Sequence, residues 1–281
     1  LGKALKKAAR RFPYFFVTLR GGLFWHYFEP CFREPVPEHE HFMPCARRRG
    51  DRHKPLCRVY AYGRTISCEY HHSITDGTGG MIFLQALVIE YLAEKSVLPL
   101  DDRSAIVDFV DLLIDPDPEE WEDSYRKYFK SESPYPDPAG KAWLIPGYRM
   151  KCGYRVTCAT LSVQAVLATA RAKKTTLTEF VTAVYMLALQ KVYRAERNGK
   201  GPRRGYPVTV QVPVNLRAMY PSKTMRNFFL FAAPSIDPRL GEWTLEEILE
   251  RVHHQMKLGV TQKEFYRYLK RNVGGEFNPL G

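Results

Sequence analysis

The sequence predicts an α/β fold made of short strands and helices in two parts. Candidate strands and candidate helices alternate along the chain, which favours a mixed fold over an all-helical or all-strand one. The 281 residues are 45% hydrophobic and 26% charged, which is enough apolar material for a sizeable core. A long polar connection over 96–150, rich in Asp and Pro, separates the two runs of elements. We therefore expect an N-terminal subdomain over 1–150 and a C-terminal one over 151–281.

The N-terminal part is expected to hold one amphipathic helix, four strands and one buried helix. Pro13 ends the first helix, because proline lacks the amide hydrogen that a helix needs. Four prolines make 34–55 a loop. The helix over 78–93 is apolar on nearly all sides, which is typical of a buried helix. The expected ranges are helices over 1–12 and 78–93, and strands over 14–19, 23–28, 56–62 and 65–70.

The C-terminal part is expected to begin with a strand and then alternate helices with strands. Ser162 is placed to cap one helix, and the T-L-T-E run from Thr176 predicts a capping box from Thr176 or Thr178. Thr244 opens a second such run, T-L-E-E. The expected ranges are strands over 153–161, 208–214 and 227–233, helices over 162–171 and 176–195, and further helices from Thr244 and Thr261. A short helix over 121–129 is expected before this part, within the 96–150 connection.

The net charge of +12 and the pI of about 9.4 limit the classes of partner. Short clusters such as Arg47–Arg49 and 203–204 are most simply solvated faces. No nucleic-acid-binding motif accompanies the charge, so we expect no nucleic-acid partner. A polyanionic cofactor such as CoA fits the sign of the charge.

The cysteines and the apolar runs indicate a reducing, water-soluble setting. The six cysteines contain no C-x-x-C pair. We therefore expect free buried thiols, and we expect neither a zinc site nor a redox site. No apolar run approaches the roughly 18 residues of a membrane helix, and no apolar signal region opens the chain. We therefore expect a cytoplasmic protein without a membrane span. The six cysteines are Cys31, Cys45, Cys57, Cys68, Cys152 and Cys158.

The run His71-His72-Ser73-Ile74-Thr75-Asp76-Gly77 carries the chemistry, between an expected strand and the buried helix. A histidine fixed in such a turn is suited to accept a proton near neutral pH. Asp76 can orient the loop or pair with a cation, and Gly77 can give the freedom to leave the turn. The run lacks the helical spacing of a zinc motif, and the chain has no G-x-S-x-G, so we expect neither a metal nor a serine nucleophile.

This run resembles the HHxxxDG signature of the CoA-dependent acyltransferase superfamily, which includes chloramphenicol acetyltransferase and condensation domains. The helix over 176–189 and the Val212–Arg217 strand, V-P-V-N-L-R, are similar to elements of its alcohol O-acetyltransferase branch. Asn227-Phe228 resembles a downstream G-N-F element, with Arg226 in place of the usual glycine.

The resemblance implies two similar α/β halves with mixed sheets and a central tunnel, in a chain that is incomplete at both ends. It implies that His72 is the general base and that Asp76 pairs structurally with Arg217. It places His71 behind the catalytic ring as a packed or hydrogen-bonded histidine. Asn227 is either an oxyanion donor near the tunnel or a strand-end cap. No bound cofactor is implied, because acyl-CoA is a co-substrate.

Three functions remain open from the sequence. The favoured one is acyl transfer, most simply acetyl transfer, from acyl-CoA to a hydroxyl or amine of a small acceptor. The second keeps the fold but takes the acyl group from an acyl carrier protein, as condensation domains do. The third is a non-catalytic binding relative, against which an intact His72 argues. Neither the acceptor nor the acyl chain length follows from the residues.

Overall fold

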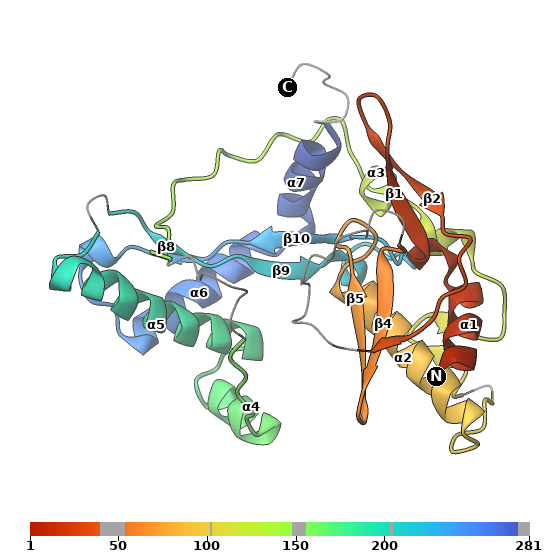
Figure 1. Cartoon of the computed structure of the whole chain (residues 1–281). Coiled ribbons are helices and arrows are strands. Elements are labelled where there is room, and N and C mark those ends of the chain that lie inside the picture. The colour runs from red at the N-terminus through yellow and green to blue at the C-terminus, as the bar shows by residue number, and fades with distance from the viewer. Residues whose placement is uncertain (40–53, 102, 148–155, 203–204, 275–281) are drawn as a thin grey trace. The chain divides into compact units, whose positions relative to one another are not determined.

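The chain divides into two compact units. The computed structural model describes residues 1–39, 54–101, 103–147, 156–202 and 205–274 (Figure 1). The first unit is Leu1–Lys127 with Tyr220–Phe228, and the second is Tyr128–Met219 with Phe229–Gly281. The expected boundary between residues 150 and 151 lies outside the described residues. Searched over the described part, the helices include none long and apolar enough to cross a membrane.

The first unit consists of two long helices, three small sheets and a short returning segment. The β1–β2 pair and the β6–β7 pair are antiparallel. In the third sheet, β4 pairs with β5 antiparallel and with β3 parallel. The elements are α1 (Gly2–Arg11), β1 (Val17–Gly21), β2 (His26–Pro30), β3 (Glu38–His39), β4 (Cys57–Tyr62), β5 (Thr65–Tyr70), α2 (Gly77–Glu94), β6 (Ile106–Val107), β7 (Val110–Asp111), the 3₁₀ helix η3 (Pro118–Trp121) and α3 (Ser124–Lys127).

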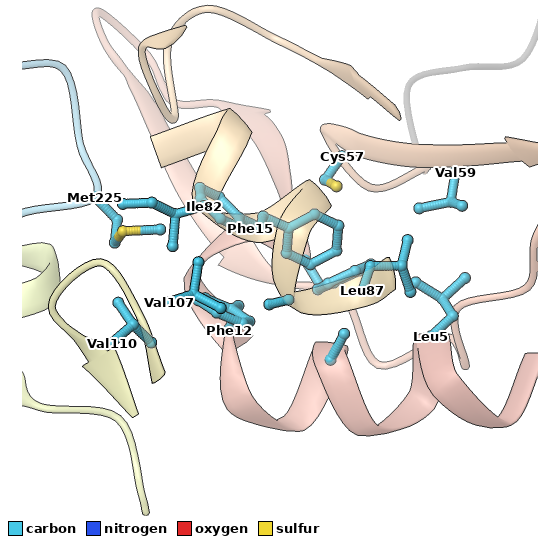
Figure 2. Close-up of a cluster of buried hydrophobic side chains, with 14 of the residues drawn as sticks. Leu5, Phe12, Phe15, Cys57, Val59, Ile82, Leu87, Val107, Val110 and Met225 are labelled. Carbon is cyan, nitrogen blue, oxygen red and sulfur yellow. The ribbon is translucent and has the colours of Figure 1, made fainter. Parts of the chain in front are cut away.

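The core of the first unit forms where α1 packs on α2. Phe12 and Phe15 meet Phe83 of α2 edge to face, with ring centroids 5.5 and 5.4 Å apart. Met225, from the returning segment, lies beside Ile82 in the same cluster (Figure 2). The segment 220–228 is therefore packed into the core of a unit that is otherwise built from the first 127 residues.

A buried ion pair fixes α1 against the segment that follows β7. The guanidinium of Arg11 donates to both carboxylate oxygens of Glu120, at 2.8 and 2.6 Å, and to the Asp111 carbonyl at 2.7 Å. Both side chains of the ion pair are buried. The Met225 amide in turn donates to the Glu120 carbonyl. A bidentate pair of this kind fixes geometry as well as charge.

The described residues of the second unit form four α-helices and two small two-stranded sheets. Strand β9 pairs with β10 and β8 with β11, both antiparallel. Its core lies between α5, α6 and β8, with Ala183, Met186, Val208 and Ile248 fully buried. The elements are α4 (Val163–Ala172), α5 (Leu177–Gly199), β8 (Val208–Thr209), β9 (Val212–Asn215), the 3₁₀ helix η4 (Leu216–Ala218), β10 (Phe229–Ala232), β11 (Ser235–Ile236), the 3₁₀ helix η5 (Pro238–Leu240), α6 (Leu245–Gly259) and α7 (Gln262–Gly274).

Several expected elements differ in their bounds. Pro13 opens a 3₁₀ turn over Pro13–Phe15, so the first strand begins only at Val17. The expected strand over 153–161 is wrong over 156–161, where the described residues are exposed and pair with no described strand. The expected helix over 121–129 is wrong in extent and splits into η3 and α3. A strand forms only where a neighbouring strand pairs with it, and a local sequence pattern does not show whether such a neighbour exists.

The cysteines of the described part are free thiols with different exposure. Cys57 is buried, Cys31 and Cys68 are half-buried and Cys158 is exposed. Cys158 therefore departs from the expected burial. Burial raises the pKa of the Cys57 thiol well above its usual value and that of Cys68 to about 11, so both stay protonated near neutral pH. Cys45 and Cys152 lie outside the described residues.

Candidate active site

The His71–Gly77 run is a tight loop between β5 and α2. The His71 amide donates to the Leu56 carbonyl at 2.9 Å, one step beyond the β4–β5 ladder. The Ile74 amide then donates back to the His71 carbonyl at 3.1 Å, which turns the chain toward α2. The strand, loop and helix follow each other here as the sequence predicted.

Asp76 is buried and caps α2. One carboxylate oxygen accepts the amide hydrogens of Thr78 and Gly79, each at 3.1 Å. The other oxygen accepts the amide of Phe228 at 2.9 Å. A buried carboxylate is stable when several N–H groups satisfy its oxygens. Asp76 therefore ties the loop, the helix start and the returning segment together.

The backbone at the start of α2 also lies very close to the backbone of Met225 in the returning segment. The Thr75 hydroxyl donates to the Met225 carbonyl at 2.8 Å. A Cβ atom added at Gly79 would lie 2.3 Å from the Thr75 hydroxyl oxygen and 2.5 Å from the Met225 carbonyl oxygen. Only glycine fits at this position, because no Cβ atom approaches other atoms so closely.

The glycine of the motif itself plays a different part from the one predicted. A Cβ atom at Gly77 would have open space around it, and its φ is not in the left-handed region. The expectation that Gly77 supplies backbone freedom is therefore wrong, and the spatial demand falls on Gly79. Gly79 and Gly80 stand side by side in the first turn of α2, where glycine lowers helix stability. This unfavourable pair is the feature of the sequence that could have indicated a close approach at Gly79.

His72 and Asn227 make two hydrogen bonds to each other across 155 residues of sequence. The Asn227 amide nitrogen donates to the His72 carbonyl oxygen at 2.7 Å. Because only the NH₂ group can donate there, the amide oxygen faces the ring, where it lies 3.1 Å from Nδ1. Nδ1 must then carry the hydrogen, which leaves the lone pair of the neutral ring on Nε2.

His71 has the opposite tautomer. Its Nδ1 accepts the Ser73 backbone N–H at 3.3 Å and lies 2.7 Å from the Ser73 hydroxyl. Since a backbone N–H only donates, Nδ1 holds the lone pair and the ring hydrogen is on Nε2. His71 is exposed and is hydrogen-bonded to Ser73, and its predicted place behind the His72 ring stays a prediction. The two neighbouring imidazoles therefore offer different nitrogens to their surroundings.

Arg217 lies in the second unit, in η4 just after β9. The Asn215 side-chain oxygen accepts both the Arg217 amide and the Arg217 guanidinium, each at 3.1 Å. The expected position of Arg217 near the end of a strand agrees with this placement. Its pairing with Asp76 of the first unit stays a prediction. The described residues contain no cluster of three or more His, Cys, Asp or Glu side chains that would hold a metal ion.

A cavity of about 350 Å³ borders the loop within the first unit. Ser73 and Ile74 line it on the loop side, and Arg226 lines it from the returning segment. Ser73 directly follows His72, and Arg226 directly precedes Asn227. The lining therefore includes a chain neighbour of His72 and a chain neighbour of Asn227, but neither His72 nor Asn227 itself. This cavity could not be predicted from local sequence patterns, because its walls come from five separate segments.

The comparisons with known proteins concern the fold. No protein-family model matches the sequence, and no curated protein matches it significantly. Polyketide synthase associated protein 5 from Mycobacterium tuberculosis is similar in structure, with a TM-score of 0.62 and 15% identity over 95% of this chain and 68% of that one.

Two further solved structures are similar. The first condensation domain of the calcium-dependent antibiotic synthetase, in complex with a substrate analogue, has a TM-score of 0.54 and 16% identity, over 100% of this chain and 69% of that one. The SgcC5 protein from Streptomyces globisporus has a TM-score of 0.50 and 16% identity, over 97% and 66%. This chain thus spans about two thirds of each.

These similarities confirm the predicted fold class. The chain has the mixed α/β fold of condensation domains, which is a CoA-acyltransferase-like fold. At 15–16% identity the similarity concerns the fold alone, because one fold carries many functions. Function has to be argued from the residues of the site.

Proposed function

We propose that the protein transfers an acyl group from a thioester to a hydroxyl or amine of a small acceptor, with His72 as the general base. The observation that carries the proposal is the His72–Asn227 pair. It orients the ring and leaves the lone pair on Nε2, which is the state that a general base requires. Asp76 and Gly79 hold the loop that presents this ring.

The chemistry follows from that tautomer. Nε2 of His72 takes the proton of the acceptor as its oxygen or nitrogen attacks the thioester carbonyl. The tetrahedral intermediate carries an oxyanion, which needs hydrogen-bond donors. Collapse breaks the carbon–sulfur bond, and the protonated His72 returns its proton to the leaving thiolate. The products are an ester or amide and a thiol, and no covalent enzyme intermediate is needed.

Two donors fit this proposal. Acyl-CoA is the donor that the HHxxxDG resemblance favours, in an alcohol O-acetyltransferase type of reaction. A carrier-protein thioester is the alternative, and it is supported by the names of the similar structures, a polyketide synthase associated protein and a condensation domain of an antibiotic synthetase. The net charge of +12 suits either polyanionic CoA or an acidic carrier protein.

The test measures thiol release with acetyl-CoA, or with an acetylated carrier protein, against a panel of alcohols and amines. We expect acceptor-dependent release that falls by about 100-fold or more in His72→Ala, as is typical for loss of a general base. His71→Ala is the matched control and should retain most of the rate, because His71 offers a different nitrogen. Equal losses in both variants would contradict the assignment of His72.

A second readout concerns Asn227 as a positioning residue. Asn227→Ala should lower kcat by about tenfold, because the Nδ1–H tautomer is no longer favoured. It should also move the acidic limb of the pH–rate profile, which loss of a purely structural side chain would not do. No release with either donor, from folded protein and across the whole panel, would favour a non-catalytic binding role.

A further inference from the structure

The cavity beside the loop has aromatic walls. Tyr14 and Trp121 form one side, with ring centroids 5.6 Å apart, and Phe28 of β2 contributes another ring. Its volume of about 350 Å³ lies in the lower part of the range of roughly 300–1,000 Å³ that is usual for small-molecule sites. An apolar body of modest size fits such walls, since aromatic side chains bury apolar surface effectively.

The aromatic wall is rigidly supported and electrically neutral. The Tyr14 hydroxyl donates to Glu120 at 2.7 Å, and the buried ion pair with Arg11 compensates the charge of Glu120. Burial raises the pKa of Tyr14, so its phenol stays uncharged at physiological pH. Trp121 directly follows Glu120 in η3. The Arg11–Glu120 pair therefore holds the wall in place without adding charge to the cavity.

Arg226 is the one charged side chain among the described residues that line this cavity. It is exposed, and it lies on the returning segment, which Asp76 and Thr75 fasten to the loop. A guanidinium presents a planar fork of N–H donors that matches a carboxylate in two places. The lining thus joins apolar walls to one cation, and Ser73 and Arg226 in this lining are the chain neighbours of His72 and Asn227.

We propose that this cavity binds a small organic acid with an apolar body, and that Arg226 receives its carboxylate. The inference rests on the proposed function, in which such an acid, carrying also a hydroxyl or amine, is the acyl acceptor. The aromatic walls hold the body, and Arg226 sets its direction. The group to be acylated then points toward the loop, where Ser73 adjoins His72.

Calorimetric titration of the whole chain tests the binding directly. The probes are two acids with their uncharged amides, phenylacetate with phenylacetamide and hexanoate with hexanamide. Within each pair the bodies are alike and only the charge differs. We expect the better-bound acid to have a Kd about tenfold lower than that of its amide. In Arg226→Gln this preference should fall to about one, with the amide still bound as in the wild type.

Matched variants separate the possible causes. Arg33→Gln removes another exposed arginine of the first unit that does not line the cavity, and it should keep the tenfold preference. Val17→Phe narrows the cavity and should weaken acid and amide alike. Equal affinity of acid and amide in the wild type, or a preference that survives Arg226→Gln, overturns the proposal.

Binding and transfer fail separately in this design. His72 does not line the cavity, so His72→Ala should bind the acids as the wild type does. Acid-selective binding without thiol release would overturn the proposed transfer and leave the site standing. Release with neutral acceptors, but no acid-selective binding, would overturn the site and leave the transfer standing.

Discussion

Helices α2 and α6 both begin with a side-chain N-cap, but the two caps differ in which parts of the chain they connect. At α6, Thr244 and Glu247 cap each other's backbone amides in a capping box, and both residues are exposed. At α2, Asp76 caps its own helix and also accepts the amide of Phe228, 152 residues away. The difference shows that a cap becomes part of a site when it also holds a distant segment.

The largest expected effect is at Asp76. Asp76→Ala leaves two buried amide hydrogens and one half-buried one without their acceptor, and it should lower the free energy of unfolding by about 3 kcal/mol. Asp76→Asn keeps one acceptor oxygen and should cost about half as much. Urea unfolding followed by far-UV circular dichroism measures both changes.

Hydrogen exchange in Asp76→Asn tests the long-range part of this comparison. The amides of Thr78 and Gly79 should exchange faster, and that of Phe228 should do so as well, because all three donate to Asp76 in the wild type. Faster exchange confined to Thr78 and Gly79 would mean that the cap is local, as at α6.

The next effect concerns the two glycines at the start of α2. Gly79→Ala places a methyl group against the Met225 carbonyl, which is main chain and cannot move aside, so a loss of about 2 kcal/mol is expected. Gly77→Ala is the matched control, since its methyl group meets open space, and it should change stability by less than about 0.5 kcal/mol. Similar losses in both variants, measured by urea unfolding, would refute the close approach.

The sequence predicted the local half of this comparison well. The cap at Ser162 and the capping boxes at Thr176 and Thr244 are confirmed, because each depends on residues at most three positions apart. Helix α2 and strand β5 agree with their predicted ranges to within one residue. The CoA-acyltransferase-like fold expected from the resemblance is also confirmed.

The long-range half was beyond the sequence. Asn227 was singled out, but its two bonds to His72 join residues 155 positions apart, and no local pattern encodes them. The same holds for the Thr75–Met225 contact that makes Gly79 necessary. The roles of His72, Asp76 and Arg217 in catalysis stay predictions.

A smaller effect is expected at the α6 start. Thr244→Ala removes the oxygen that accepts the Glu247 amide at 3.3 Å and should cost about 1 kcal/mol, the usual value for an exposed cap. Thr160→Ala, at an exposed position outside any helix, should cost nearly nothing. Urea unfolding gives both values, and a Thr244→Ala loss as large as that of Asp76→Ala would contradict the distinction between the two helix starts.

The smallest expected effect lies at α5, whose cap is intermediate between the other two. Glu179 accepts the Thr176 amide at 2.8 Å and contacts His253 at 3.1 Å, so it links two helices of one unit. Burial alone would raise the pKa of Glu179, but the bonds from Thr176 and the contact with His253 outweigh it. The net result is a pKa below the usual 4.5.

The sign of the pH dependence follows from that lowered pKa. A carboxyl whose pKa is lower in the folded state stabilises the fold above its unfolded pKa, and this contribution disappears as the pH falls through the folded value. The stability difference between wild type and Glu179→Gln should therefore be under about 1 kcal/mol at pH 7 and shrink steadily from pH 5 to pH 3. Glu242→Gln, at an exposed position outside any helix, is the control and should show no such trend. Urea unfolding at each pH measures both differences, and a difference that grows on acidification would mean that the link to His253 and Thr176 does not favour the charged carboxylate.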